Sequence, residues 1–260
     1  MRSTGIFAAF AVLAMVFLLC SCGPDRSNKI VMVTEATFPP YEFREGGRIV
    51  GIDVDLMQAV AQEIGKELVV EDMSFDSVIS AVVTGKADVA ASGITVTEDR
   101  KRQGLHLMLS IQHNLTLAKR QGNFSLPYVE AKQVIIVPEN SAVKEAKDLK
   151  GKRIGVQHGT TGDTYVTKHI QEPERFPNGA LAVAALEAGK LDAVVLDGEP
   201  SKVHVSMRRN LKILDMPLTT EEYAVAISKK NTKLLEQVNA AIKKMKENGK
   251  LAEIKAKYIK

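Results

Sequence analysis

The sequence contains no tryptophan, few other aromatic residues and only two cysteines. Aromatic residues make up 5% of its 260 residues, which argues against a protein that binds single-stranded nucleic acid by stacking bases on aromatic rings. The two cysteines, Cys20 and Cys22, lie together near the N-terminus, so the chain has no disulfide framework. Its 35 basic and 31 acidic side chains leave a net charge of +4 without a block of one sign. We therefore expect no nucleic-acid partner.

Long hydrophobic runs are absent as well. The longest nearly continuous apolar stretch, Ile6 to Leu19, has 14 residues, which is too short to span a bilayer comfortably as a helix. The hydrophobic fraction of 45% and the charged fraction of 25% are those of a soluble globular protein, and they exclude intrinsic disorder and a polytopic membrane protein. A chain of this length can form one large domain or two lobes.

The apolar stretch near the N-terminus has the features of a targeting signal. It follows the basic start Met1-Arg2 and ends in Leu19-Cys20-Ser21-Cys22, which resembles a bacterial lipobox with Cys22 as the lipidated residue. We predict a lipoprotein signal peptide at 1–22 and a polar tether at 23–28. Plain secretion and a retained membrane anchor are the alternatives. The expected location is the periplasm, with a lipid anchor in the bacterial membrane. Display of the protein on the outward surface of the cell is an open alternative.

The remainder of the chain alternates strand and helix patterns. Strands are expected at 29–33, 68–70, 88–91, 153–156 and 193–196, and helices at 53–65, 75–83, from 163 onward, at 180–188 and at 231–246. The helical segments carry apolar residues at the 3.6-residue period, as Leu56, Met57 and Val60 do. Alternation of this kind predicts an α/β fold in which helices cover parallel sheets.

An internal echo predicts two similar lobes. Residues 82–89 read Val-Val-Thr-Gly-Lys-Ala-Asp-Val, and residues 186–193 read Leu-Glu-Ala-Gly-Lys-Leu-Asp-Ala. Each segment combines a helix end, a Gly-Lys turn and an Asp before a buried strand. Two α/β halves place a cleft between them at the carboxyl ends of their strands, where ligands collect in such sheets.

Several motifs occur in the order typical of one family. They are Thr34-Glu35-Ala-Thr-Phe38-Pro-Pro40-Tyr41-Glu-Phe43, Gly51-Ile-Asp53-Val-Asp55-Leu, Gly85-Lys86-Ala-Asp88, Ser92-Gly93-Ile-Thr95-Val-Thr97-Glu-Asp-Arg100, Phe124-Ser125-Leu-Pro127-Tyr128, Asp148-Leu-Lys-Gly151, Gly155-Val-Gln157-His-Gly159-Thr160-Thr161 and Leu191-Asp192-Ala-Val-Val-Leu-Asp197. Together they resemble the periplasmic solute-binding proteins for polar amino acids that serve ABC importers. Each motif alone is weak, whereas the ordered series is specific.

The resemblance implies a two-lobed periplasmic-binding-protein fold of type II with two hinge crossings. The first lobe would comprise 29–130 and 223–260, and the second 131–222. We expect a monomer that binds an amino acid as its small-molecule ligand, needs no cofactor or metal and hands the ligand to an ABC transporter permease. Domain closure about the two crossings is what such a partner could sense.

The same resemblance implies which residues bind the ligand, and the chemistry fits. A guanidinium such as that of Arg100 can hold a carboxylate through two parallel hydrogen bonds, and the Thr95 N–H and hydroxyl add donors. Asp197 is the expected partner of the ammonium group. Ser92 and Gly93 are expected to add contacts, and the Gly93 carbonyl would reach the ammonium. The N–H groups of Thr160 and Thr161 would add donors at the entry to a helix. Phe38 and Phe75 would lie on either side of the ligand side chain.

Each of these residues has a purely structural alternative. Arg100 could be a surface arginine in the charged run 98–102, and Asp197 could cap a turn before Gly198. Phe38 and Phe75 could be ordinary core residues. Thr160 and Thr161 could form only a helix cap, although a cap and an anion site are compatible.

Glu35 and Gln157 are the expected selectors of the ligand side chain. Glu35 stands where the family commonly carries Asp, and an acid there suits a guanidinium, an ammonium or an amide while it repels glutamate and aspartate. Gln157 could add a hydrogen bond or line the end of a strand. We expect arginine or another basic amino acid, lysine or histidine, with glutamine next.

One segment departs from the family pattern. Lys101-Arg-Gln-Gly104 recurs as Lys119-Arg-Gln-Gly122, and deletion of 105–122 would restore the family's usual spacing. Within this expected insertion, apolar residues keep a period of two, which is a strand pattern. It could be a flap, a partner surface or a tolerated excursion, and it could displace Arg100.

Two other classes of function stay open. An enzyme such as a dehydratase could use the same scaffold, but the sequence has no Gly-x-Ser-x-Gly motif and no His-Glu-x-x-His spacing. His158 is more readily explained as a strand-end residue than as a base. A surface adhesin would leave the cleft residues without a role.

Overall fold

The structure is a computed structural model, and it describes residues 27–101 and 123–259. The predicted signal peptide 1–22 with its lipid-modified Cys22, most of the tether and the predicted insertion 105–122 lie outside these residues. Within the described ranges, every helix is too short or too polar to cross a membrane.

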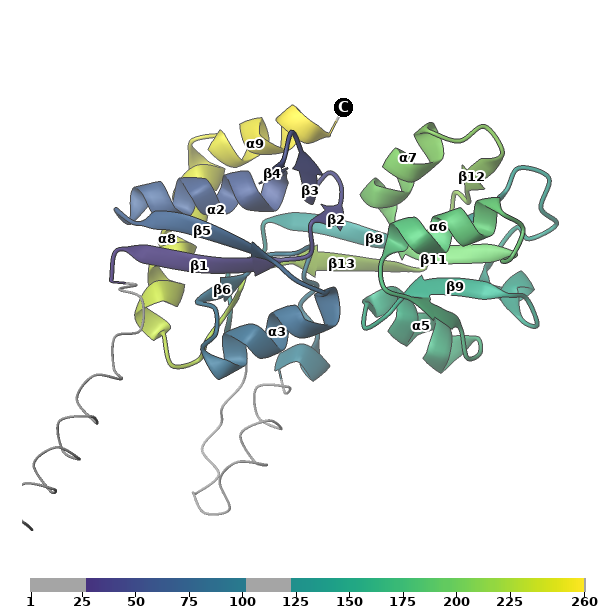
Figure 1. The fold of residues 1–260 in the computed structure, drawn as a ribbon, viewed down its shortest axis with the longest axis horizontal. Helices are drawn as coiled ribbons and strands as arrows, with labels where there is room; N and C mark the ends of the chain where they lie inside the picture. The colour runs from purple at the N-terminus through teal and green to yellow at the C-terminus, as the bar shows by residue number, and fades with distance from the viewer. Residues whose placement is uncertain (1–26, 102–122, 260) are drawn as a thin grey trace, which may run out of the picture.

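The first lobe is built on a five-stranded sheet in the order β5-β1-β6-β14-β7 (Figure 1). Its parallel part consists of β1 (Lys29–Thr34), β5 (Glu67–Asp72) and β6 (Val89–Ala90). β14 (Ala226–Ile227) and β7 (Asn123–Phe124) extend the sheet in antiparallel fashion. Five of the six residues of β1 are buried, because helices cover both faces of the parallel part.

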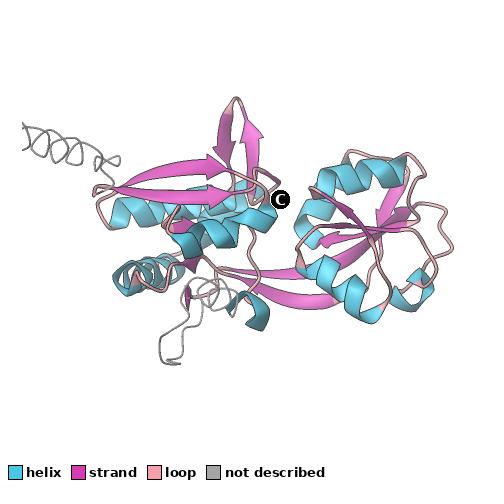
Figure 2. Cartoon of the chain, turned by 60° about the horizontal axis from the view of Figure 1, so that its bottom comes forward, coloured by secondary structure: helices cyan, strands magenta, loops and turns pink. Residues whose placement is uncertain are grey.

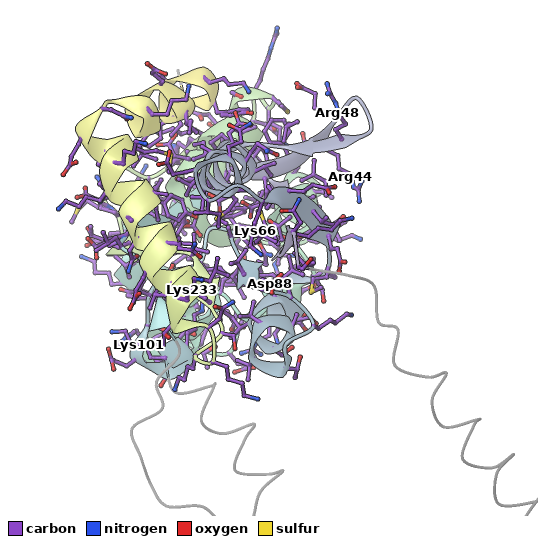
Figure 3. The ribbon with its side chains drawn as sticks, turned by 90° about the vertical axis from the view of Figure 1, so that its left-hand side faces the viewer. Arg44, Arg48, Lys66, Asp88, Lys101 and Lys233 are labelled. Atoms are coloured by element: carbon purple, nitrogen blue, oxygen red, sulfur yellow. The ribbon has the colours of Figure 1, made fainter. Side chains whose placement is uncertain are left out.

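Within the described residues this lobe has four complete helices, and residues 98–101 are helical as well. The four are α2 (Ile52–Glu63), α3 (Phe75–Thr84), α8 (Thr232–Glu247) and α9 (Lys250–Tyr258). Helix α8 crosses one end of the lobe, with Lys233 near its first turn (Figure 3). The helix α9 was not expected, and Gly249 separates it from α8 with a left-handed φ of 81° that favours glycine.

A small antiparallel sheet, also unexpected from the sequence, lies beside the cleft. It consists of β2 (Thr37–Phe38), β3 (Glu42–Glu45) and β4 (Arg48–Val50). Gly51 joins it to α2 with a φ of 135°, and a Cβ atom there would lie 2.1 Å from the Tyr41 carbonyl oxygen. Only glycine fits this close approach. The small sheet thereby fixes Phe38 and Tyr41 next to the first-lobe strands.

The second lobe has a six-stranded sheet whose main order is β10-β9-β11-β8-β12. β9 (Ile154–Gln157), β10 (Glu174–Phe176) and β11 (Ala193–Asp197) are parallel. β8 (Val129–Pro138) runs against β11, β12 (Leu211–Ile213) and β13 (Thr219–Tyr223). The lobe also contains η1 (Ala146–Leu149), α5 (Thr161–His169), α6 (Gly179–Glu187) and α7 (Gly198–Ser206).

Two strands, β8 and β13, pass side by side between the lobes, which confirms the two-lobed α/β fold with two crossings (Figures 1 and 2). Their register pairs Val129 with Tyr223 and Gln133 with Thr219. The main sheet of each lobe has three neighbouring parallel strands on one side, β5-β1-β6 and β10-β9-β11. The strands that follow them, β14 and β8, run antiparallel.

Candidate functional site

One pocket lies between the lobes at the carboxyl ends of the parallel strands. Its ten lining residues are all among the eleven predicted from the sequence: Glu35, Phe38, Phe75, Gly93, Thr95, Arg100, Gln157, Thr160, Thr161 and Asp197. The eleventh, Ser92, does not line it. Ser92 is buried, and its hydroxyl donates to the Glu42 Oε1 at 2.9 Å and accepts from the Glu35 N–H at 3.0 Å. Its place in the structure is beneath the pocket wall.

The lobes are closed around this pocket. The Gln157 amide donates to the Glu35 Oε2 across the cleft at 3.1 Å, and the Arg100 guanidinium donates to the Gly159 carbonyl at 3.3 Å. The lining side chains leave about 10 Å³ of free space, about what one water molecule needs. An amino acid can therefore enter only if the lobes separate and these side chains move.

Arg100 is held in the pocket by its local sequence. It lies in the helical residues 98–101, and its backbone N–H donates to the Thr97 hydroxyl at 3.1 Å, which caps this turn. The guanidinium donates to the Thr95 carbonyl at 2.9 Å and lies 5.3 Å from the centre of the Phe75 ring. The neighbouring segment 105–122 lies outside the described residues, and Arg100 keeps its place in the pocket.

The charge of Arg100 is buried, and no described carboxylate lies against it as an ion-pair partner. The residue is 8% exposed, and none of the carboxylates in 27–101 and 123–259 forms an ion pair with it. Burial lowers the pKa of Arg100, and the charges of Glu221 and Asp197 oppose this effect from a greater distance. A buried cation costs free energy unless it is paired, so this group is suited to receive a carboxylate.

The start of α5 provides backbone donors beside Arg100. The helix begins at Thr161, two residues before the expected Asp163, because Thr160 is the N-cap and its hydroxyl accepts the Asp163 N–H at 3.2 Å. The first N–H groups of a helix have no partner within the helix, and they favour anions. The cap and an anion site thus coexist at Thr160 and Thr161.

Asp197 ends β11 on the opposite wall and is 6% exposed. One of its oxygens accepts from the Tyr223 hydroxyl, and the other accepts from the Gln133 amide at 2.8 Å. The pKa of Asp197 is raised to about 7. Burial is the main cause and the charge of Glu221 adds to it, whereas the hydrogen bonds from Tyr223 and Gln133 and the charge of Arg100 limit the rise. Near neutral pH the carboxyl of the free protein is therefore only partly ionised, and a cation that arrives beside it completes the ionisation.

Three residues of the crossing strands also serve the pocket, and the sequence did not indicate them. Gln133 lies on β8, and Glu221 and Tyr223 lie on β13. The Thr95 hydroxyl donates to the Glu221 Oε2 at 2.6 Å, so this hydroxyl offers the pocket an acceptor rather than the donor that was expected. The sequence signal for Glu221 and Tyr223 was their place at the predicted lobe boundary near residue 222, and Gln133 follows the other predicted boundary, at 130/131, by a few residues.

Glu35 and Gln157 form the far end of the pocket. Both are buried, at 6% and 1% exposure, so the Glu35 carboxylate faces the pocket and not the solvent. Its carboxylate accepts from the Thr37 hydroxyl and the Gln157 amide, while burial raises the pKa of Glu35. The Gln157 Oε1 is buried and has no hydrogen-bond partner among the residues described. This end of the pocket therefore presents acceptors.

Phe38 and Phe75 line the pocket from the first lobe, but they differ in surroundings. Phe38 is buried, stacks on Tyr41 at 5.7 Å and lies where a Cβ on Gly93 would approach its ring to 2.7 Å. Gly93 has a left-handed φ of 52°, so glycine is required there for two reasons. Phe75 is only partly buried and stacks under Arg100.

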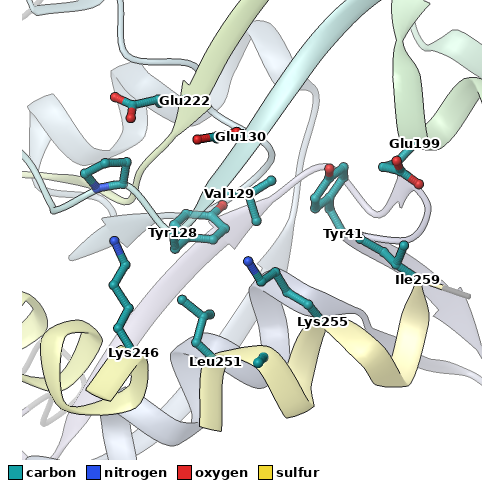
Figure 4. Close-up of a pocket in the computed structure, with 12 residues that line it drawn as sticks. Tyr41, Tyr128, Val129, Glu130, Glu199, Glu222, Lys246, Leu251, Lys255 and Ile259 are labelled. Atoms are coloured by element: carbon teal, nitrogen blue, oxygen red, sulfur yellow. The ribbon is translucent and has the colours of Figure 1, made fainter. Parts of the chain in front are cut away.

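A second, larger groove of about 490 Å³ lies elsewhere between the lobes (Figure 4). Lys246 and Lys255 extend into it from the C-terminal helices, and Glu130 and Glu222 come from the crossing strands. It contains none of the predicted site residues. No described group of three or more His, Cys, Asp or Glu side chains could hold a metal ion.

The part of the chain that matches known proteins contains every residue that lines the pocket. Residues 30–260 match the family model of bacterial extracellular solute-binding proteins, family 3. The arginine-binding extracellular protein ArtP of Bacillus subtilis (strain 168) is 30% identical, over 94% of this chain and 93% of that protein. A probable histidine-binding protein of Neisseria gonorrhoeae is 33% identical, over 97% and 94%. The solved structure of an ancestral arginine-binding protein bound to arginine is 35% identical, with a TM-score of 0.79, over 90% of this chain and 99% of that one.

Proposed function

Because the chain belongs to the bacterial extracellular solute-binding proteins of family 3, we propose that it binds a basic L-amino acid, arginine foremost, between its lobes and delivers it to the permease of an ABC importer. Relatives named as arginine-binding and histidine-binding proteins support this assignment. The protein acts as a binding component and not as an enzyme.

The buried guanidinium of Arg100, which has no ion-pair partner in the part of the chain that the structure describes, carries the proposal. It binds the α-carboxylate through two parallel hydrogen bonds, together with the N–H groups at the start of α5. Asp197 on the facing wall binds the α-ammonium. A free amino acid carries both charges on adjacent groups, which suits a pocket with a cation and an anion on opposite walls.

The ligand side chain reaches Glu35 and Gln157. A guanidinium has five N–H donors and no acceptor. It therefore matches the Glu35 carboxylate and the Gln157 Oε1, which accepts no hydrogen bond from any described residue. Glutamate and aspartate would bring a second anion against Glu35. Histidine, lysine and glutamine supply fewer donors and rank below arginine.

The N-terminal region completes the proposal. Cleavage at the lipobox leaves a lipidated Cys22, which anchors a monomer outside the cytoplasmic membrane through the tether 23–28. The first lobe comprises 29–130 and 223–260, and the second 131–222. The lipid anchor would keep the protein close to the permease that it serves.

A thermal-shift screen of the purified protein against the twenty amino acids tests the function. A ligand at one hundred times its Kd stabilises the folded protein by about 2.7 kcal/mol if it binds only that state. We expect the largest shift with arginine and recovery of the amino acid chemically unchanged. Mass spectrometry of the denatured protein controls for ligand that was already bound. No shift after removal of such ligand would refute the proposal.

The selector role of Glu35 has its own test. Glu35→Gln replaces an acceptor carboxylate by a neutral amide, so arginine should bind about 10- to 100-fold more weakly because a charge-assisted pair is lost. Glutamine affinity should change by less than about threefold, since its neutral side chain loses no ion pair. Equal loss for both ligands would show that Glu35 only supports the fold.

The affinity should also depend on pH. Because the pKa of Asp197 is raised to about 7 in the free protein, a ligand ammonium must expel a proton from this carboxyl at lower pH. Arginine should therefore bind up to about 100-fold more weakly at pH 5 than at pH 8. The raised pKa of Glu35 acts in the same direction. Titration calorimetry measures this profile, and a flat profile between these values would contradict it.

A further inference from the structure

Glu221 connects the two lobes at the edge of the pocket. Its Oε2 accepts from the Thr95 hydroxyl of the first lobe at 2.6 Å and from the Thr161 hydroxyl of the second at 2.8 Å. Its Oε1 accepts from the Thr219 hydroxyl at 2.8 Å. Thr95 and Thr161 line the pocket, whereas Glu221 stands behind them on the crossing strand β13. One carboxylate oxygen therefore holds hydroxyls from both sides of the cleft.

These contacts fix the direction of the two hydroxyl groups. An ionised carboxylate can only accept hydrogen bonds, whereas a hydroxyl has one proton and two lone pairs. Thr95 and Thr161 must therefore give their protons to Glu221 and turn lone pairs elsewhere. Thr161 uses one lone pair to accept from the Gln133 amide at 3.1 Å. What the hydroxyls can still offer a ligand is acceptors.

The orientation of Glu221 follows from the period of a strand. Successive side chains of β13 point to opposite faces, and Tyr223, on the same face as Glu221, donates its hydroxyl proton to Asp197. Glu222 lies on the other face and lines the large groove. On the face of β13 that is turned to the pocket, Glu221 thus contacts Thr95 and Thr161, and Tyr223 contacts Asp197.

We propose that Glu221 is a positioning residue of the amino-acid site: by taking the hydroxyl protons of Thr95 and Thr161, it makes both hydroxyls acceptors for the ligand ammonium. This inference rests on the proposed function. The arrangement joins Thr95 of one lobe to Thr161 of the other, so it exists only when the lobes are closed. Glu221 consequently strengthens ammonium recognition at the moment of closure, in concert with Asp197.

An alternative role would have the opposite consequence. Glu221 could compete with the ligand, since its carboxylate occupies two hydroxyl donors that a ligand carboxylate could use. In that case its removal would free these donors and tighten binding. The two roles are distinguished by the sign of the effect and by the ligand group that it concerns.

The test compares L-arginine with 5-guanidinopentanoic acid, the same molecule without the α-amino group. Titration calorimetry measures both ligands with the wild-type protein, Glu221→Ala, Glu221→Gln and the matched control Glu222→Gln from the other face of β13. We expect Glu221→Ala to weaken arginine binding at least about 10-fold and to change binding of the analogue by less than about threefold. Glu221→Gln keeps one acceptor oxygen and should lose less, and Glu222→Gln should bind both ligands as the wild type does.

Three results would overturn the proposal while the proposed function stands: tighter arginine binding by Glu221→Ala, equal weakening for both ligands, or no change. Circular dichroism checks the fold of each variant, and Glu221→Gln decides the matter if Glu221→Ala does not fold. Failure of the wild-type protein to bind any amino acid would instead refute the proposed function, and this inference with it. If the screen selects another amino acid, that ligand and its form without the α-amino group take the place of arginine.

Discussion

Arg100→Ala should abolish amino-acid binding and leave the fold intact. Removal of one partner of a buried charged pair costs about 3 to 5 kcal/mol, which corresponds to roughly 200- to 5,000-fold in Kd. The free protein should be as stable as the wild type or more so, because it no longer buries a cation that has no ion-pair partner among the described residues. Titration calorimetry and thermal unfolding measure the two effects.

Two further variants sharpen this prediction. Arg100→Lys should also bind poorly, since an ammonium cannot form two parallel hydrogen bonds with a carboxylate. Lys101→Ala is the matched control, because Lys101 follows directly in sequence but pairs with Glu98 at 2.7 Å on the surface. Retention of wild-type affinity by Arg100→Ala would show that the carboxylate is bound elsewhere.

Asp197→Asn should produce the second-largest loss. Truncation of a buried charge partner at a binding site costs about 2 to 5 kcal/mol, so amino-acid affinity should fall at least about 30-fold at pH 8. The loss should be smaller at pH 5, where the wild-type carboxyl is already protonated. Asp192→Asn is the control, because Asp192 forms a surface ion pair with Arg153 at 2.7 Å.

The same substitution should stabilise the free protein at high pH. The pKa of Asp197 rises from 3.8 to about 7 on folding, so this group's contribution to stability is complete below pH 3.8 and is lost as the pH rises through 7. At pH 8 the wild type must bury a carboxylate, whereas Asp197→Asn buries a neutral amide. A higher Tm for Asp197→Asn at pH 8 is expected. An equal or lower Tm would mean that the carboxylate is well accommodated without ligand.

Much of the pocket could be predicted because its residues follow strands in recognisable motifs. Glu35 and Asp197 come at or just after the ends of β1 and β11, and the carboxyl ends of parallel strands meet at one edge of a sheet. Arg100 needed the family order, since a charged run alone predicts a surface helix. Ser92 shares a motif with Gly93, but its hydroxyl is bonded to Glu42 and to the Glu35 N–H outside the pocket, contacts that no local pattern predicts.

The contribution of the crossing strands to the pocket could not be predicted in the same way. Glu221 and Thr161 are 60 residues apart in sequence, and only the register of β8 with β13 brings Glu221 and Tyr223 to the pocket. No local periodicity specifies that register. The small sheet β2-β3-β4 was missed for a related reason: its strands have two to four residues, which is too short for a hydrophobic period to show.

Direct calorimetric titration of the ligand-stripped wild-type protein with L-arginine at pH 8, beside Arg100→Ala, tests the central claim most directly. The closed, charge-lined pocket predicts saturable binding of one arginine per chain by the wild type and no measurable binding by the variant. Equal binding of arginine by both proteins would contradict the claim that this pocket is an amino-acid site. So would the absence of any heat of binding when the wild type is titrated with arginine and with each of the other amino acids.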